Sequence, residues 1–223
     1  MSNNVILFDI DYTLFNTELY RDLVFHQLHA FFPESVNFNE IATEAYAKIR
    51  ETGWFEIPKF TTELLTHFSK TVDKKLLEDV WKDKAILGKA LYPEAIDVLT
   101  SLSKSHATLG IFSSGFLDFQ KAKIVPLGHL FAEEHLHIHI LKDEKMPEII
   151  KKYQGKKIIL IDDYIPVIEK AKKADPHITT IWIKRGRLAD KVAPTADFPP
   201  DFIIENLKGL IPIVEKELPG VSI

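Results

Sequence analysis

The feature that most constrains the fold is a series of short apolar runs separated by helical patterns. The runs are rich in β-branched and aromatic residues and lie at 5–8, 107–112, 158–161, 179–183 and 202–204. Runs of this length and composition are typical of strands that are buried on both faces. Strands that alternate with helices form βαβ units. The sequence therefore predicts an α/β fold with a doubly wound, mainly parallel, Rossmann-like sheet.

The alternation is interrupted between residues 15 and 90, where only helical stretches occur and no strand-like run is found. The last of these stretches carries an apolar stripe at helical spacing, made of Leu76, Leu77, Val80 and Trp81. The length of 223 residues suits a core that carries a smaller second domain. We expect a core made of residues 1–14 and 91–223, with an all-helical domain at 15–90.

Composition excludes several classes of protein. The chain has no Cys, which excludes a disulfide scaffold, a Cys-ligated metal and a Cys nucleophile. Its formal net charge of −4 argues against a general nucleic-acid binder, for which a basic surplus is expected. No apolar stretch approaches the roughly 20 residues of a membrane span, and the N-terminus does not resemble a signal peptide. We expect a cytoplasmic protein with no membrane or nucleic-acid partner.

Two aspartates follow the first predicted strand directly, in the segment VILFDIDYTLFNT. Asp9 and Asp11 are two residues apart, so on extended backbone their side chains point to the same side. Open α/β sheets bind ligands at the carboxyl ends of their strands. The pair therefore marks a candidate site, although two surface aspartates in a turn would give the same pattern.

Polar residues also end or follow later predicted strands. Ser113, Ser114 and Gly115 could hold a phosphate oxygen, and Lys142 or Lys145 could pair with phosphate. Each group alone is also compatible with an ordinary polar turn.

Asp162 and Asp163 close a fully apolar strand, which is hard to explain structurally. Like charges about 4 Å apart repel by roughly 4 kcal/mol at an effective dielectric constant of ~20. Gathering four aspartates at one edge of the sheet would thus need a cation, and oxygen ligands favour Mg²⁺.

In this order, the motif Asp9-x-Asp11-x-Thr13, Ser113, a lysine within 142–145 and the pair Asp162-Asp163 resemble the haloacid dehalogenase superfamily of phosphohydrolases. The resemblance covers nearly the whole chain, and the helical insert stands where one subclass carries an α-helical cap. The chain departs from the family at Ser114, where Asn is common, and at Val167, where many members have an acidic residue.

The resemblance implies a role for each matching residue. Asp9 would be the nucleophile that forms an aspartyl-phosphate, and Asp11 would be the general acid and base. Ser113, Ser114, Gly115 and the lysine would bind the phosphoryl group, and Thr13 would support the loop. Mg²⁺ would lie among Asp9, the Asp11 carbonyl, Asp162 and Asp163. Of the two lysines we expect Lys145, because it directly precedes a helix start marked by Pro147.

The expected function is Mg²⁺-dependent hydrolysis of a small phosphorylated metabolite, by a monomer or weak homodimer. A phosphomutase would need the same residues, whereas a haloacid dehalogenase has no use for Asp11. A non-catalytic phosphate-binding protein would have lost Asp9 or Asp11. A response-regulator receiver carries its paired acidic residues early in the chain and has no room for the helical insert.

Three histidines alternate with apolar residues at 135, 137 and 139. They could bind zinc, but the same pattern is typical of a half-exposed strand, which is the interpretation we favour.

Overall fold

The structure is a computed structural model that describes residues 4–51, 53–69, 71–187, 189 and 191–218. The outermost residues of the expected core therefore lie outside the described part. The chain divides into two compact units, one made of Met1–Asn16 with Leu91–Ile223 and the other of Thr17–Ala90. Each unit is described by itself.

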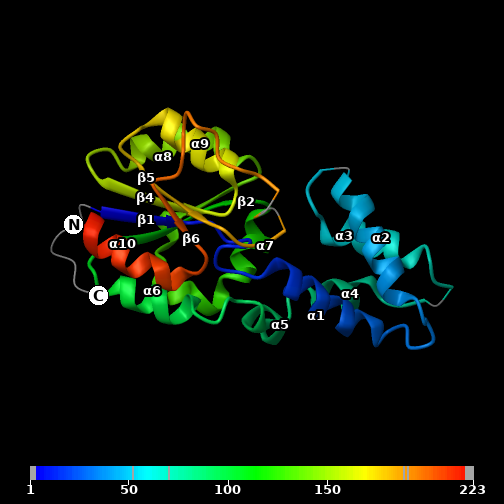
Figure 1. Cartoon of the computed structure of the whole chain (residues 1–223). Helices are drawn as coiled ribbons and strands as arrows, with labels where there is room; N and C mark the ends of the chain where they lie inside the picture. The colour runs from blue at the N-terminus through cyan, green and yellow to red at the C-terminus, as the bar shows by residue number, and fades with distance from the viewer. Residues whose placement is uncertain (1–3, 52, 70, 188, 190, 219–223) are drawn as a thin grey trace. The chain divides into compact units, whose positions relative to one another are not determined.

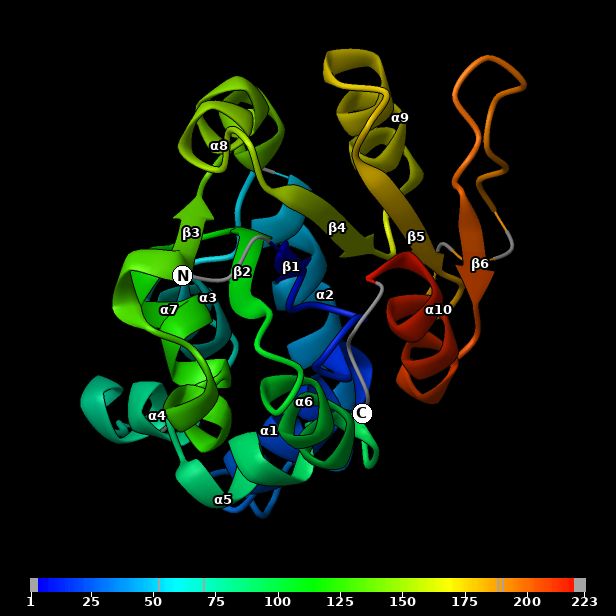
Figure 2. The same cartoon turned by 90° about the vertical axis from the view of Figure 1, so that its left-hand side faces the viewer.

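The core unit contains a six-stranded sheet in which every neighbouring pair of strands is parallel, in the order β3-β2-β1-β4-β5-β6 (Figure 2). The strands are β1 (Asn4–Phe8), β2 (Thr108–Ser114), β3 (Leu136–His139), β4 (Lys157–Asp162), β5 (Thr179–Ile183) and β6 (Phe202–Ile204). This is the strand order of a Rossmann-like, doubly wound sheet. The predicted fold class is confirmed, and the five apolar runs coincide with strands to within two residues at each end.

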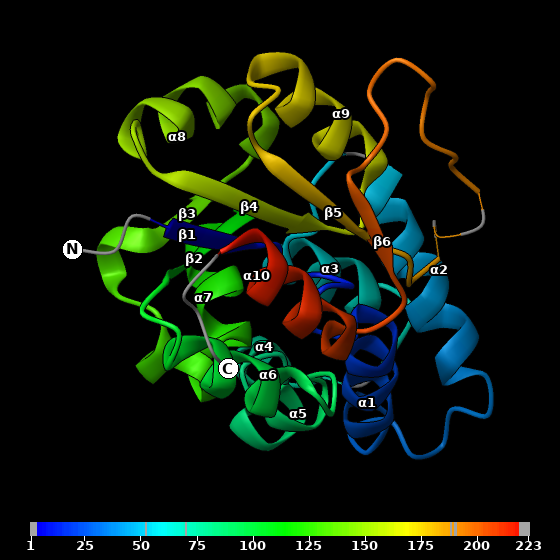
Figure 3. The same ribbon diagram turned by 60° about the vertical axis from the view of Figure 1, so that its left-hand side comes forward.

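Helices cover both faces of the sheet, with α8 and α9 on one face and α6 and α10 on the other (Figures 1 and 3). The α-helices of this unit are α6 (Ala95–Ser103), α7 (Leu117–Lys123), α8 (Met146–Lys152), α9 (Ile165–Ala174) and α10 (Leu210–Glu217). No helix within the described residues is both long and apolar enough to cross a membrane.

The two covered faces explain why the central strands are apolar at every position. In β1, Val5 and Leu7 belong to the cluster that also holds Met146 and Ile149 of α8 and Val167 of α9. The alternate residues of β1 point to the opposite face and are also buried. A strand covered on both sides loses the polar alternation of a half-exposed strand.

The order of the strands indicates where on the sheet a ligand would bind. The chain winds outward from β1 in both directions, toward β3 on one side and toward β6 on the other. The carboxyl ends of adjacent strands on the two sides of such a switch point open a crevice in which α/β proteins bind ligands. The ends of β1, β2 and β4 therefore lead to the site, and the Asp9 amide donates to the Ile161 carbonyl at 3.0 Å, which ties the β1 loop to β4.

The second unit is helical in its described residues: α1 (Thr17–His29), α2 (Phe38–Glu51), α3 (Ile57–Leu65), α4 (Lys74–Val80) and α5 (Lys84–Lys89). Its centre is aromatic, with Trp81 in ring contact with Phe55 at 4.7 Å and Phe60 at 5.2 Å between centroids. These three rings are buried. The unit therefore has a hydrophobic core of its own.

Candidate active site

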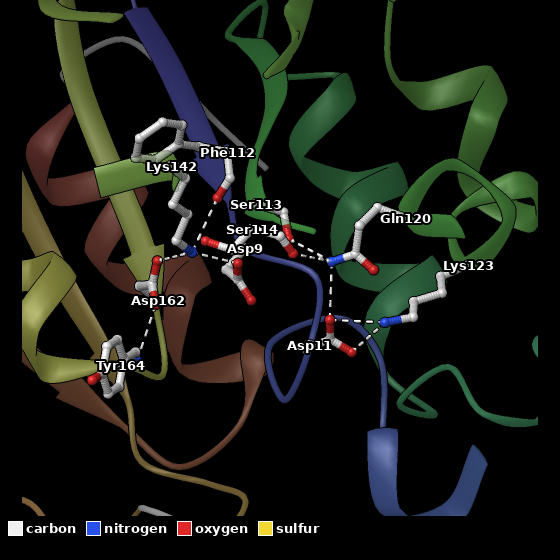
Figure 4. Close-up of polar contacts among 10 residues, drawn as sticks. All are labelled: Asp9, Asp11, Phe112, Ser113, Ser114, Gln120, Lys123, Lys142, Asp162 and Tyr164. Atoms are coloured by element: carbon white, nitrogen blue, oxygen red, sulfur yellow. Dashed lines mark hydrogen bonds and ion pairs between the residues drawn. The ribbon is translucent and has the colours of Figure 1, made fainter. Parts of the chain in front are cut away.

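A buried lysine joins two aspartates at the carboxyl edge of the sheet (Figure 4). The Lys142 ammonium donates to Asp9 Oδ1, to Asp162 Oδ2 at 2.6 Å and to the Phe112 carbonyl at 3.3 Å. The exposed fractions of the three charged side chains are 5% for Lys142, 7% for Asp9 and 0% for Asp162. An ammonium group has three N–H donors, so each donor of Lys142 has a partner.

Burial and crowding govern the electrostatics of this group. Burial raises the pKa of Asp9 to about 7, with Asp162 and Asp11 adding to the rise and Lys142 opposing it. Burial also raises the pKa of Asp162, although Lys142 and the Tyr164 amide stabilise its charged form. Burial alone would lower the pKa of Lys142, but the Asp162 and Asp9 carboxylates raise it. Lys142 therefore stays charged. The buried carboxylates repel one another, and a further cation would reduce this repulsion.

Asp163 completes a group of three carboxylates that could hold a metal ion. One oxygen each of Asp9, Asp162 and Asp163 lies within 4.8 Å of the others. Burial, followed by the Asp9 and Asp162 charges, raises the pKa of Asp163 well above its usual value. At 4.8 Å each pair of charges repels by roughly 3 kcal/mol at an effective dielectric constant of ~20. When all three carboxylates are ionised, their negative charge exceeds the single positive charge of Lys142, and a divalent cation would neutralise the excess. Carboxylate oxygens are hard ligands of the kind that Mg²⁺ prefers.

Asp11 is bound separately from this group, on the side of helix α7 (Figure 4). Lys123 Nζ donates to both of its carboxylate oxygens, at 2.6 and 2.8 Å, and Gln120 Nε2 donates to Oδ2 at 2.9 Å. The Asp11 carboxylate is not among the three that converge. The contribution of its carbonyl to a metal site stays a prediction.

The loop after β1 turns sharply to direct Asp11 away from Asp9. Tyr12 adopts a positive φ of 59°, a conformation that few residues with a side chain adopt. The amides of Thr13, Leu14 and Phe15 all donate to the Ile10 carbonyl, at 2.9–3.2 Å. Thr13 is fully buried, and its Oγ1 has no hydrogen-bond partner among the described residues. It therefore supports the loop through its backbone and its packing.

The end of β2 supplies the predicted phosphate-binding turn. Gln120 Nε2 lies 3.0 Å from Ser113 Oγ, 2.8 Å from the Ser114 carbonyl and 2.9 Å from Asp11 Oδ2. An amide nitrogen has two hydrogens, and the carbonyl and the carboxylate can only accept. When the two hydrogens of Gln120 Nε2 are donated to the Ser114 carbonyl and to Asp11 Oδ2, the Ser113 hydroxyl is free to donate its own hydrogen to another acceptor. Gly115 has φ of +138°, and a Cβ there would lie 3.0 Å from Gln120 Cγ.

Lys145 does not lie in this cluster, so its expected placement was wrong. Its ammonium pairs with Glu148 at 2.7 Å, and 40% of its side chain is exposed. Helix α8 does begin beside Pro147, as predicted, but residues Lys142–Lys145 form a short 3₁₀ helix between β3 and α8. That helix rises about 2 Å per residue, so the two lysines at its ends are roughly 6 Å apart along its axis.

Sequence reasoning missed Gln120 and Lys123. Their only signal is their spacing of three residues, which places both on one face of the helix after the Ser113 turn. That spacing is common on helices that bind nothing.

Two of the alternating histidines, His137 and His139, belong to strand β3 as we expected, whereas His135 ends a short 3₁₀ helix just before it. His135 Nδ1 and His137 Nε2 both contact the Tyr153 hydroxyl, at 2.9 and 2.8 Å. Within the described residues, the group of three potential metal ligands is the aspartate cluster and does not include these histidines.

Several known proteins are similar to this chain over nearly its full length. No protein-family model matches the chain. A pyrophosphatase, PpaX, from Bacillus anthracis is 22% identical over 223 residues, covering 96% of this chain and 97% of its own. A glyceraldehyde 3-phosphate phosphatase from Methanopyrus kandleri is 24% identical over 226 residues, covering 95% of this chain and 97% of its own.

Two solved structures show the same fold. A haloacid dehalogenase-like hydrolase from Burkholderia xenovorans superposes with a TM-score of 0.76 at 23% identity, covering 98% of this chain and 99% of its own. An L-2-haloacid dehalogenase from Xanthobacter autotrophicus gives 0.56 at 16% identity, covering 97% and 99%. The chain is thus similar over nearly its full length to two curated phosphatases, and it shares its fold with haloacid dehalogenase-like hydrolases. The resemblance found in its motifs is thereby confirmed, and the superfamily includes both phosphatases and dehalogenases.

Proposed function

We propose that the protein is a Mg²⁺-dependent phosphatase that hydrolyses a small phosphorylated metabolite through an aspartyl-phosphate on Asp9. The observation that carries this proposal is the separation of two carboxylates on one loop. Asp9 contacts Lys142 within the cluster of carboxylates that could hold a metal ion, whereas Asp11 is held apart by Lys123 and Gln120. This separation supports a division of roles in which Asp9 attacks and Asp11 transfers a proton. The full-length relatives named as phosphatases support the same reaction class.

In the first step an Asp9 oxygen bonds to phosphorus as the bond from phosphorus to the ester oxygen breaks. Asp11 donates a proton to that departing oxygen. In the second step water attacks the phosphorus of the aspartyl-phosphate, Asp11 accepts a proton from this water, and the bond from phosphorus to Asp9 breaks. The products are an alcohol and inorganic phosphate, and both aspartates return to their starting state.

Ser113 and Lys142 stabilise the phosphoryl group as negative charge spreads over its oxygens. The Ser113 hydroxyl can donate a hydrogen bond, and Lys142 supplies a buried positive charge beside Asp9. The resemblance adds Ser114 and Gly115 to this binding set.

The cation would be held by Asp9, Asp162 and Asp163. Their buried carboxylate oxygens converge, and the positive charge nearby does not balance their negative charge. When bound, Mg²⁺ supplies the charge that allows an anionic carboxylate to approach an anionic phosphate. Lys142 remains necessary beside the cation, because it also fixes the orientation of the Asp9 carboxylate.

We propose that the helical unit acts as a cap that selects the substrate. The chain enters it directly after the loop that carries Asp9 and Asp11, and leaves it at Leu91, before the rest of the core. Its aromatic residues form a core of its own, so it can be varied without disturbing the sheet. A cap of this kind closes over small substrates and excludes bulk water.

Dehalogenation is the second candidate, since solved dehalogenases share the fold. A departing halide takes no proton, so that reaction would not require Asp11. The three N–H contacts that hold Asp11 favour the phosphatase. A phosphomutase would use the same residues but would transfer the phosphoryl group to a second hydroxyl.

The test is phosphate release from a panel of phosphorylated metabolites, with Mg²⁺ and with excess chelator. We expect release with Mg²⁺ and none with chelator, and Asp9→Asn should abolish release while the circular dichroism spectrum stays unchanged. Full activity in chelator would contradict the proposal. So would halide release from 2-haloacids in the absence of any phosphatase activity.

A further inference from the structure

The Asp11 carboxylate is bound by one face of helix α7. Lys123 contacts both of its oxygens, and Gln120 contacts one of them and also reaches the Ser114 carbonyl. The Asp11 side chain keeps an exposed fraction of 28%, whereas that of Lys123 is 5%. The Asp11 carboxylate is thus partly accessible, while the Lys123 side chain beside it is buried (Figure 4).

Lys123 is an unusual residue to bury on a short surface helix. Burying an ammonium group is costly unless it is paired and hydrogen-bonded. Here the cost is offset by the two contacts to Asp11 and by the rings of Phe119 and Phe15, whose centroids lie 4.7 and 5.5 Å from Nζ. Lys121, two residues earlier, shows the ordinary arrangement, since it pairs with Glu133, whose side chain is 75% exposed.

The Asp11 carboxylate that Lys123 contacts is not one of the three carboxylates that could hold a metal ion. Asp11 is two residues from Asp9, yet only Asp9, Asp162 and Asp163 converge within the described residues. A divalent cation held by these three carboxylates would also attract the carboxylate of Asp11. The ammonium of Lys123 provides a competing positive charge on the opposite side of Asp11, away from the cluster.

We propose that Lys123 is the positioning residue for Asp11: it holds the carboxylate at the leaving oxygen of the substrate and away from the metal cluster. The proposal rests on the proposed phosphatase function and adds a residue that the superfamily motifs do not include. Lys123 acts through Asp11 and touches neither the phosphoryl group nor the nucleophile. Its loss therefore matters most where the leaving oxygen depends on a transferred proton.

The test compares Lys123→Met with Lys121→Met, which removes a lysine of the same helix whose side chain is 32% exposed. Each variant is assayed with Mg²⁺ on a primary alkyl phosphate, whose alkoxide leaves poorly, and on nitrophenyl phosphate, whose leaving group needs little protonation. In single-turnover experiments that follow release of the alcohol, and hence the first step alone, Lys123→Met should lower the rate at least ~30-fold on the alkyl phosphate and no more than ~3-fold on nitrophenyl phosphate, following the leaving-group dependence of general acid catalysis. Lys121→Met should match the wild type on both substrates.

A double-mutant cycle with Asp11→Asn tests whether the effect of Lys123→Met depends on the Asp11 carboxylate. In the Asp11→Asn background, Lys123→Met should change the alkyl phosphate rate less than ~3-fold, because residues that act as a unit are not additive. Lys123→Gln, which keeps polar contacts without the charge, gives the same comparison if Lys123→Met does not fold.

Equal losses on the two substrates, an undiminished effect in the Asp11→Asn background or wild-type rates would each overturn the inference. The failure of the proposed function has a different signature, since the wild-type protein would then hydrolyse neither substrate.

Discussion

Replacing Lys142 with Met should remove most activity and weaken the fold. The substitution keeps the length of the side chain but deletes the ammonium that donates to Asp9, Asp162 and the Phe112 carbonyl. Two buried carboxylates then face each other without their cation. Removing one partner of a buried ion pair typically costs about 3–5 kcal/mol of stability. Removing a charge that stabilises the transition state typically lowers kcat ~100- to 1,000-fold.

Lys145→Met is the matched control, because it removes a lysine that is three residues away and pairs with an exposed glutamate. We expect Lys145→Met to retain kcat within about threefold, since exposed ion pairs contribute little. The assays are steady-state phosphate release with Mg²⁺ and urea unfolding in chelator at pH 8, which lies above the pKa of Asp9. If Lys145→Met lost activity while Lys142→Met kept it, the geometry-based assignment would be refuted.

Three further predictions follow from the same site. Asp11→Asn should slow the hydrolysis of an alkyl phosphate more than that of nitrophenyl phosphate, and single-turnover rates with equal losses would count against its acid role. Because the pKa of Asp9 is about 7 when folded against 3.8 for the ordinary group, the folded protein binds the extra proton between these values. Metal-free stability should therefore fall as pH rises from about 4 to 7, by up to about 4 kcal/mol; urea unfolding of Asp9→Asn, which lacks this group, should show a smaller fall. Substitutions on the surface of the helical unit should alter the ranking of substrates more than the rate on a small aryl phosphate, and a series that never changes the ranking would favour the core as the selector.

Much of the fold could be predicted because the features that determine it are visible in short stretches of sequence. The apolar runs at β1, β4 and β5 are uniformly buried, and a strand covered on both faces has no alternative to a continuous apolar sequence. The position of Asp9, Ser113 and Asp162 followed from the same pattern, because parallel strands bring their carboxyl ends to one edge. The helical insert was recognisable because it contains no strand-like run.

The choice of lysine could not be made from local sequence. Lys142 and Lys145 both precede the helix that begins near Pro147, and they stand at opposite ends of a short 3₁₀ helix. What separates them is their partners, because Lys142 contacts Asp9 and Asp162 whereas Lys145 pairs with Glu148. Gln120 and Lys123 were missed for a related reason. Their contacts with Asp11 join residues more than one hundred positions apart, and these contacts depend on how α7 packs against the β1 loop.

The central claim is that the phosphoryl group passes through Asp9. The most direct measurement is a rapid acid quench of the enzyme with a substrate labelled in its phosphoryl group, in the presence of Mg²⁺, followed by peptide analysis. The account predicts a transient label on the peptide that contains Asp9, sensitive to hydroxylamine and absent from Asp9→Asn. Turnover without labelling of that peptide, or stable labelling of another residue at a catalytically competent rate, would contradict it.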